Sequence, residues 1–179
     1  MHRTSQFLRH YHRTRVANRA TKPCDVFINH RGIDTKRTVA TLLYDHFYRL
    51  NLHPFLDSKN MKPGDKLFDN INGAIRKCKV GVAVFSPRYC ESYFCLHELA
   101  LMMESRKKWT MEKCAMEDIR RFNWALEEAK YTVGLTFDSL KGNWSDVVTS
   151  ASDNVIKTLI EMEGEKQMQR HKSSPILDV

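Results

Sequence analysis

The sequence predicts an α/β domain built on a parallel sheet with right-handed crossovers. Short apolar runs of strand length alternate with longer segments in which apolar residues recur at helical spacing. One of the short runs, residues 80–85, is apolar on both faces, which is typical of a central parallel strand. At 179 residues, the chain is long enough for one domain with its own hydrophobic core.

The first half of the domain is expected to hold three strands and two helices. Residues 26–28 are a short apolar run closed by a polar loop, which indicates a buried strand. Asp34 or Thr35 can cap a helix whose apolar stripe ends at Leu50. A second strand is expected at residues 53–56, a polar loop at 57–65, a helix at 67–75 and the third strand at 80–85.

The second half is expected to hold three helices and one strand. Apolar residues recur at helical spacing in three segments, and a further apolar run is typical of a strand. The helices are expected at residues 95–103, at 119–129 and from about residue 143 or 145 to residue 162, and the fourth strand at residues 132–137.

The charged residues divide the chain into three parts. Six basic residues precede the first acidic residue, Asp25, and without them 23 Lys and Arg stand against 21 Asp and Glu. The net charge of +8 therefore belongs largely to the N-terminal segment, and binding of nucleic acid is not expected. We expect residues 1–23 to be a basic arm, either disordered or an organelle transit peptide. Residues 24–163 are expected to form the globular domain, and residues 164–179 a polar tail.

Several classes of protein have no motif in this chain. No apolar run is long enough for a membrane span, so no membrane-crossing helix is expected. Five cysteines without a C-x-x-C pair disfavour a disulfide framework and a metal site, and they favour a reducing compartment. Glycine-rich phosphate loops, nucleophile elbows and H-E-x-x-H are absent. We expect a cytoplasmic protein, with a nuclear or organellar location as the alternative that the basic arm suggests.

Glu98 is the carboxylate that the helical pattern singles out. It lies about one turn into the helix that follows the third strand, so it can face the same crevice as Arg31 and Gly32 after the first strand. On a helical wheel it falls about 100° from Leu99, at the edge of the apolar stripe. Partial desolvation there would raise its pKa. On position alone, a solvated glutamate at the boundary of the stripe is favoured over a catalytic or ligand-binding acid, since charged residues usually stay in water.

Three motifs of the chain resemble a TIR (Toll/interleukin receptor) domain of the plant type. The family pattern D-V-F-[LI]-S-F-R-G-x-D-T-R corresponds to residues 25–36, and F-x-D-x-x-x-[LM]-x-x-G-[DE] corresponds to residues 55–65. The pattern [VF]-S-x-x-Y-x-x-S-x-W-C-L-x-E-L corresponds to residues 85–99. The resemblance is close over about residues 24–104 and loose over 116–163. It implies a flavodoxin-like fold, with four or five parallel strands flanked by helices.

The resemblance also implies a function in plant innate immunity. It implies an NAD+ hydrolase that cleaves the bond between nicotinamide and ribose, with NAD+ as substrate and no cofactor or metal. Glu98 is implied as the catalytic carboxylate, and the implied substrate-binding residues are Arg31, Gly32, Ile33, Asp34, Thr35, Lys36 and Gly64. The implied partners are other TIR domains or immune receptors, with a homo-oligomer as the active form.

Four departures from the family pattern keep a second function open. Asn29-His30 stands in place of Ser-Phe, Phe94 in place of Trp, and Thr41-Leu42 in place of a Ser-His pair used in self-association. Residues 105–115 lack the apolar run of the family's fourth strand, so the strand at 132–137 could pair with residues 80–85 instead. The alternative function is a non-catalytic TIR adaptor or decoy that binds other TIR domains.

Overall fold

A parallel sheet of three strands lies at the centre of the computed structural model, which describes residues 24–107 and 118–173. The strand β1 (Val26–His30) pairs with β2 (Pro54–Phe55) on one side and with β3 (Val80–Val84) on the other. All five residues of β1 are buried. The expected α/β architecture with a parallel sheet is confirmed, and β1 is its central strand.

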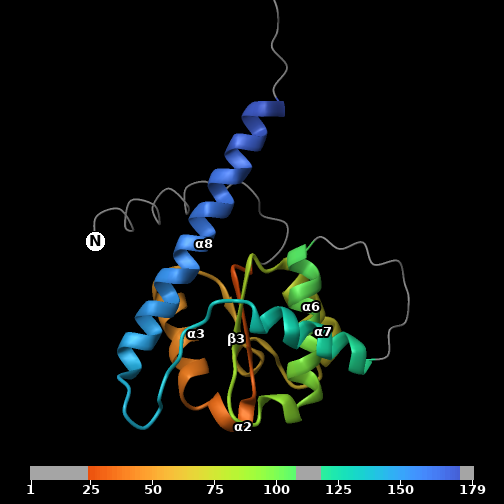
Figure 1. The fold of residues 1–179 in the computed structure, drawn as a ribbon, viewed down its shortest axis with the longest axis vertical. Helices are drawn as coiled ribbons and strands as arrows, with labels where there is room; N and C mark the ends of the chain where they lie inside the picture. The colour runs from red at the N-terminus through yellow and green to blue at the C-terminus, as the bar shows by residue number, and fades with distance from the viewer. Residues whose placement is uncertain (1–23, 108–117, 174–179) are drawn as a thin grey trace, which may run out of the picture.

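Helices cover both faces of the sheet, and Figure 1 shows α3 and α8 on one side of β3 and α6 and α7 on the other. Val26 and Ile28 pack in one core cluster with α3 and α8, whereas Phe27 packs with α5 and α6. This alternation follows from the two-residue period of a strand. The helices are α2 (Gly32–Thr35), α3 (Val39–Arg49), α4 (Asp57–Asn60), α5 (Leu67–Lys77), α6 (Tyr93–Lys107), α7 (Asp118–Lys130) and α8 (Trp144–Ser173), with a 3-10 turn η1 (Tyr89–Glu91).

The expectation of four or five strands is wrong for the part of the chain that the structure describes, which holds three. Residues 132–137 form no strand, and Val133 there is 99% exposed. The chain has to pass from α7 to α8 on the other side of the sheet, and it crosses as a loop instead of adding to the edge (Figure 1). The segment at 108–115, where the family pattern has its fourth strand, lies outside the described residues.

The strand β3 is an edge strand among the described residues, not the central strand that its composition predicts. Its sequence is apolar on both faces because each face meets a layer of helices. Val80, Val82 and Val84 pack against the α3 and α8 cluster, and Ala83 packs against the α6 and α7 cluster. A strand that is apolar on both faces is therefore expected to have helices packed on both faces. This pattern does not determine how many strands pair with it.

The helix expected from Asp34 or Thr35 to Leu50 is divided into α2 and α3. Thr38 bonds the carbonyl of Thr35 with its N–H and with its hydroxyl, so a tight turn replaces continued α-helix. The last helix begins where it is expected and continues past Gly164 to Ser173, beyond the body of the molecule (Figure 1). The domain limits at residues 23 and 163 stay predictions, and the basic arm lies outside the described residues. No helix within residues 24–107 and 118–173 has the length and apolarity that a membrane crossing requires.

Candidate active site

Glu98 lies at the carboxyl end of β1, where a buried network of hydrogen bonds joins it to the sheet. Asn29 is fully buried and stands on the same face of β1 as Phe27, the face that α6 covers. Its amide nitrogen donates to Oε2 of Glu98 at 2.8 Å and to the carbonyl of Cys95 at 3.1 Å. The Tyr89 hydroxyl donates to Oδ1 of Asn29 and also lies 3.1 Å from the Cys95 carbonyl oxygen. Strand, turn and helix thus meet at one carboxylate.

Burial raises the pKa of Glu98 from its ordinary 4.5 to about 7. The hydrogen bond from Asn29 opposes this rise, and the nearby Asp57 carboxylate adds to it. The raised pKa agrees with the place of Glu98 at the edge of the apolar stripe of its helix. Near neutral pH the group is therefore divided between its acid and its carboxylate forms.

The loop after β1 holds a set of ion pairs. Arg31 lies 3.1 Å from a carboxylate oxygen of Glu91, and its Nε is 3.9 Å from Asp34. Asp34 accepts hydrogen bonds from the Ser86 hydroxyl at 2.7 Å and from Arg88. The bond from Ser86 is the main reason that the pKa of Asp34 lies below its ordinary value. Residues after the first and the third strand therefore do meet.

His30 lies beside this loop with its side chain only 3% exposed. Its Nδ1 is 3.0 Å from the Thr35 hydroxyl, which donates to the Arg31 carbonyl, and its Nε2 is 3.5 Å from Asp57. The imidazole holds the pKa of Asp57 below its ordinary value. His30 Nε2 and Arg31 Nε are buried and make no hydrogen bond within the described part of the chain. Each of these nitrogens nevertheless lies within 4 Å of a carboxylate oxygen, that of Asp57 for His30 and that of Asp34 for Arg31.

The other residues expected to bind substrate lie at the surface. Gly32, Ile33 and Lys36 are exposed, and a side chain at Gly32 would meet no atom within 4 Å. Gly64 lies in the exposed turn between α4 and α5 with a φ of +92°, a conformation that favours glycine. The turn is closed by hydrogen bonds between Lys62 and Asp65. No hydrogen bond of the described residues joins this turn to Glu98.

Three residues of the network are not predicted as site residues from the sequence. Asn29 stood out only as a departure from the family pattern, and Tyr89 and Asp57 only as positions inside the motifs. The two-residue period of a strand was the available signal, because it places Asn29 on the face opposite to Ile28. The sequence did not show that this face meets the first turns of α6.

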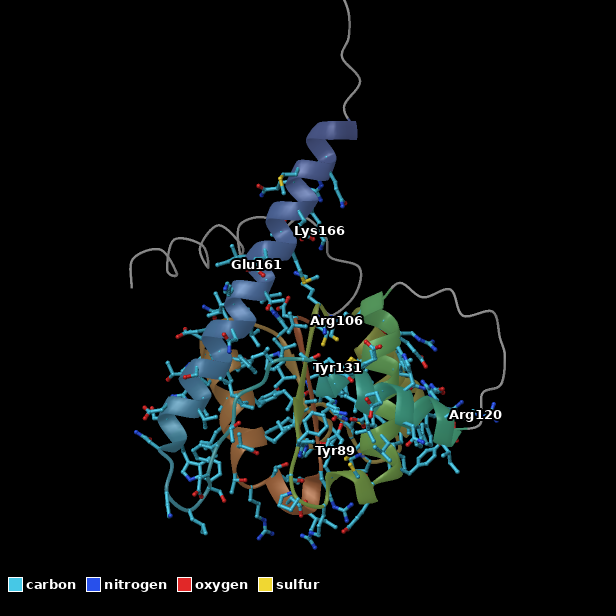
Figure 2. All side chains as sticks on the ribbon, in the orientation of Figure 1. Tyr89, Arg106, Arg120, Tyr131, Glu161 and Lys166 are labelled. Carbon is cyan, nitrogen blue, oxygen red and sulfur yellow. The ribbon has the colours of Figure 1, made fainter. Side chains whose placement is uncertain are left out.

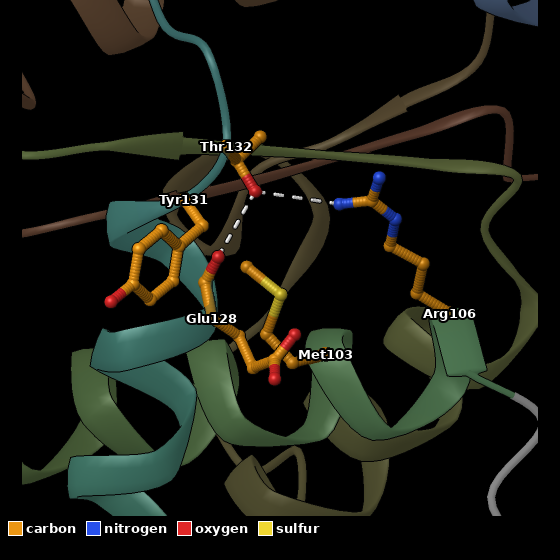
Figure 3. A pocket seen from close by; sticks show the side chains of 5 residues that line it. All are labelled: Met103, Arg106, Glu128, Tyr131 and Thr132. Carbon is orange, nitrogen blue, oxygen red and sulfur yellow. Dashed lines mark hydrogen bonds between the residues drawn. The ribbon is translucent and has the colours of Figure 1, made fainter.

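A separate cavity lies at the other end of α6. It has a volume of about 230 Å³ and is lined by Met103, Arg106, Glu128, Tyr131 and Thr132 (Figure 3). Figure 2 shows Arg106 and Tyr131 well away from Tyr89, which marks the Glu98 end of the molecule. Thr132, in the lining, donates to the Glu128 carbonyl. The cavity contains none of the residues expected from the sequence. Among the described residues, no cluster of His, Cys, Asp and Glu could hold a metal ion.

The arrangement around Glu98 suits stabilisation of a positive centre. A carboxylate in a partly desolvated place interacts strongly with charge that develops nearby. A pKa of about 7 also suits proton transfer at neutral pH. The Glu98 carboxyl group, held by the buried Asn29 donor, can therefore serve both purposes.

Residues 24–114 match the pattern of a family described as the TIR domain. The chain is 46% identical over 158 residues to a Brachypodium distachyon protein described as "Probable 2' cyclic ADP-D-ribose synthase BdTIR". That alignment covers 78% of this chain and 70% of the relative. The chain is also 32% identical over 85 residues to TMV resistance protein N of Nicotiana glutinosa, covering 48% of this chain and 7% of the relative.

A solved structure has the same fold. It is the set of TIR domains in the activated Roq1 resistosome, which directly recognises the pathogen effector XopQ. The TM-score is 0.63 at 21% identity, over 74% of this chain and 99% of that chain. At this identity the likeness establishes the fold, a parallel sheet flanked by helices, and nothing about chemistry.

Proposed function

The chain belongs to the TIR domain family, and from this premise we propose that it is an enzyme that cleaves the nicotinamide–ribose bond of NAD+. The observation that carries the proposal is the half-buried Glu98, which Asn29 holds and whose pKa burial raises to about 7. A second support is the similarity to the Brachypodium distachyon protein described as a probable 2' cyclic ADP-D-ribose synthase.

The chemistry requires one carboxylate. Nicotinamide leaves as a neutral pyridine from a pyridinium, so the leaving group needs no proton and the general acid of ordinary glycosidases is unnecessary. Positive charge develops on the ribose carbon, and the Glu98 carboxylate stabilises it. The attacking hydroxyl must lose one proton, which Glu98 can accept because its pKa is close to neutral.

The attacking hydroxyl decides the product. Water gives ADP-ribose, whereas a ribose hydroxyl of the same molecule gives a cyclic product, and each route releases one nicotinamide and one proton. Hydrolysis is the activity that the family resemblance implies. The similarity to the Brachypodium distachyon protein, described as a synthase of a cyclic product, favours cyclisation, so both products are expected from the same first step.

We propose that the loop after β1 and the turn at Gly64 bind the substrate. Arg31 is the candidate for the pyrophosphate, because guanidinium pairs well with phosphate oxygens and its Nε is buried without a hydrogen bond in the described chain. Binding would require Arg31 to exchange its ion pair with Glu91 for one with the substrate. Residues 32–36 and Gly64 would complete the site through backbone that approaches the ligand.

The biological context proposed is signalling in plant innate immunity from the cytoplasm. The similarity to TMV resistance protein N supports the immune context. The proposed partners are other TIR domains or immune receptors, and the proposed active form is an oligomer. The likeness to domains of an assembled resistosome is compatible with that form.

A second candidate function is a non-catalytic adaptor or decoy. The observation that favours it is the sheet, which ends at β3 in the described residues and holds three strands there instead of the four or five that the resemblance implies. In this case the chain would bind other TIR domains without consuming NAD+.

Incubation of concentrated, purified protein with NAD+ separates the two functions. The enzyme releases nicotinamide together with ADP-ribose or its cyclic form, and mass spectrometry of the products identifies the attacking hydroxyl. An oligomeric, folded protein that leaves NAD+ intact would refute the proposed activity and favour the adaptor.

A further inference from the structure

The amide of Asn29 is the polar group in closest contact with Glu98. It is fully buried at the end of the central strand, where an unsatisfied amide would be costly. Each of its polar atoms has a partner: the nitrogen donates to Glu98 and to the Cys95 carbonyl, and the oxygen accepts from Tyr89. A buried polar network of this kind is tolerated because it is fully satisfied.

We propose that Asn29 is a positioning residue that holds the Glu98 carboxylate, and that Tyr89 fixes the orientation of the Asn29 amide. This inference rests on the proposed function of Glu98 and assigns its supporting residues. Asn29 acts through Glu98 and need not touch the substrate.

The partners determine which way the amide faces. Glu98 and the Cys95 carbonyl oxygen are acceptors, so they require the two N–H donors of the amide. With the amide held this way, its oxygen faces the Tyr89 hydroxyl, which donates to it. Burial raises the pKa of Tyr89 above its ordinary value, so its hydroxyl keeps the proton that it donates. The reversed amide would place its oxygen against two other oxygens.

The contact leaves one side of the carboxylate for a ligand. Asn29 binds Oε2 of Glu98, whereas Oε1 accepts no hydrogen bond from the part of the chain that the structure describes. One oxygen is thus fixed by the sheet, and the other is available for the positive centre of the substrate. A single donor on one oxygen fixes the carboxylate without neutralising it.

The position differs from the plant family pattern, which has serine there. A serine hydroxyl carries one hydrogen and donates to one acceptor at a time, whereas the amide donates to two. Asn29 can therefore serve the Cys95 carbonyl and Glu98 together. The amide hydrogen bond to Glu98 is therefore a feature of this chain that the family pattern, with serine at this position, does not include.

Asn29 also opposes the groups that favour the protonated acid. Titratable groups face Glu98 from three elements: Asp57 of α4, Tyr89 of η1 and Cys95 of its own helix α6. None of them is a cation, and Asp57 raises the pKa of Glu98 further. The Asn29 donor is the contact that lowers it. Loss of this donor is therefore expected to move the titration of Glu98 to higher pH.

The test is a ¹³C NMR titration of the Glu98 carboxyl in the full chain, with the resonance assigned from a Glu98→Gln sample. Asn29→Ala should move the midpoint upward by about one pH unit. Tyr89→Phe keeps the ring and should move it in the same direction by less. Ser152→Ala is the matched control, because it removes a buried hydroxyl that donates to the Val148 carbonyl at 2.7 Å on α8.

The readout does not depend on turnover, so the two proposals fail separately. An unchanged midpoint in folded Asn29→Ala overturns the positioning role, even if the wild type cleaves NAD+. If Asn29→Ala does not fold, Tyr89→Phe decides, and an unchanged midpoint there overturns the role as well. A shifted midpoint in a protein that leaves NAD+ intact supports the positioning role and refutes the proposed activity. In an active protein, the acid limb of kcat/KM should move with the NMR midpoint.

Discussion

Replacement of Glu98 by Gln should stabilise the fold, and increasingly so as the pH rises. The folded chain holds the Glu98 proton up to a pH of about 7, whereas an exposed carboxyl in the unfolded chain releases it near 4.5. Between these values the folded state binds the extra proton, so stability falls as the pH rises through this window. The fall amounts to about 3 kcal/mol in all, because one pKa unit corresponds to about 1.4 kcal/mol.

Glutamine keeps the shape and the acceptor for Asn29 but does not ionise. The stability of Glu98→Gln relative to wild type should therefore increase by about 2.5 kcal/mol between pH 5 and pH 8. Urea denaturation followed by circular dichroism at pH 5, 6, 7 and 8 measures this difference. Glu127→Gln, at an exposed carboxylate on α7, is the matched control. A difference for Glu98→Gln that stays constant across this pH range would refute the raised pKa of Glu98.

Three further variants test other parts of the structure. Gly64→Ala should lose about 1 kcal/mol in urea denaturation, because the φ of +92° strains any L side chain although no atom lies within 4 Å; unchanged stability would contradict this turn geometry. Asp25→Ala should lose about 3 kcal/mol, since the buried carboxylate accepts from the His53 N–H at 2.9 Å and lies 3.4 Å from Lys79; a loss below about 1 kcal/mol would show that this network is dispensable. Arg31→Ala should raise the KM for NAD+ about tenfold with an unchanged circular dichroism spectrum, and an unchanged KM would remove Arg31 from the proposed site.

The sequence predicts well those elements whose apolar periodicity depends only on residues nearby in the chain. The strand at residues 26–28 and the helix at 67–75 appear as β1 and α5, each within two residues of the expected limits. The prediction of a strand at residues 132–137 is wrong, because a strand needs a neighbouring strand to pair with and the alternating apolar residues do not specify one. The chain there crosses the sheet as a loop between α7 and α8.

The candidate site shows the same division. The helical wheel places Glu98 at the edge of the apolar stripe, because that position depends on the helix alone, but by itself it favours a solvated side chain. The contact between Asn29 and Glu98 joins residues 69 positions apart, and it depends on how α6 lies against β1. The family pattern places both residues in motifs but has serine at the position of Asn29, so it gives no indication of the amide contact.

Nicotinamide release by Glu98→Gln, compared with wild type and with Glu104→Gln, tests the central claim most directly. Glu104 lies on the same helix and pairs with Arg121, away from the proposed site. If Glu98 is the catalytic carboxylate, Glu98→Gln should lose at least about a hundredfold in turnover of NAD+, while Glu104→Gln stays near the wild-type rate. Equal loss in both variants, or turnover by Glu98→Gln at the wild-type rate, would contradict the assignment.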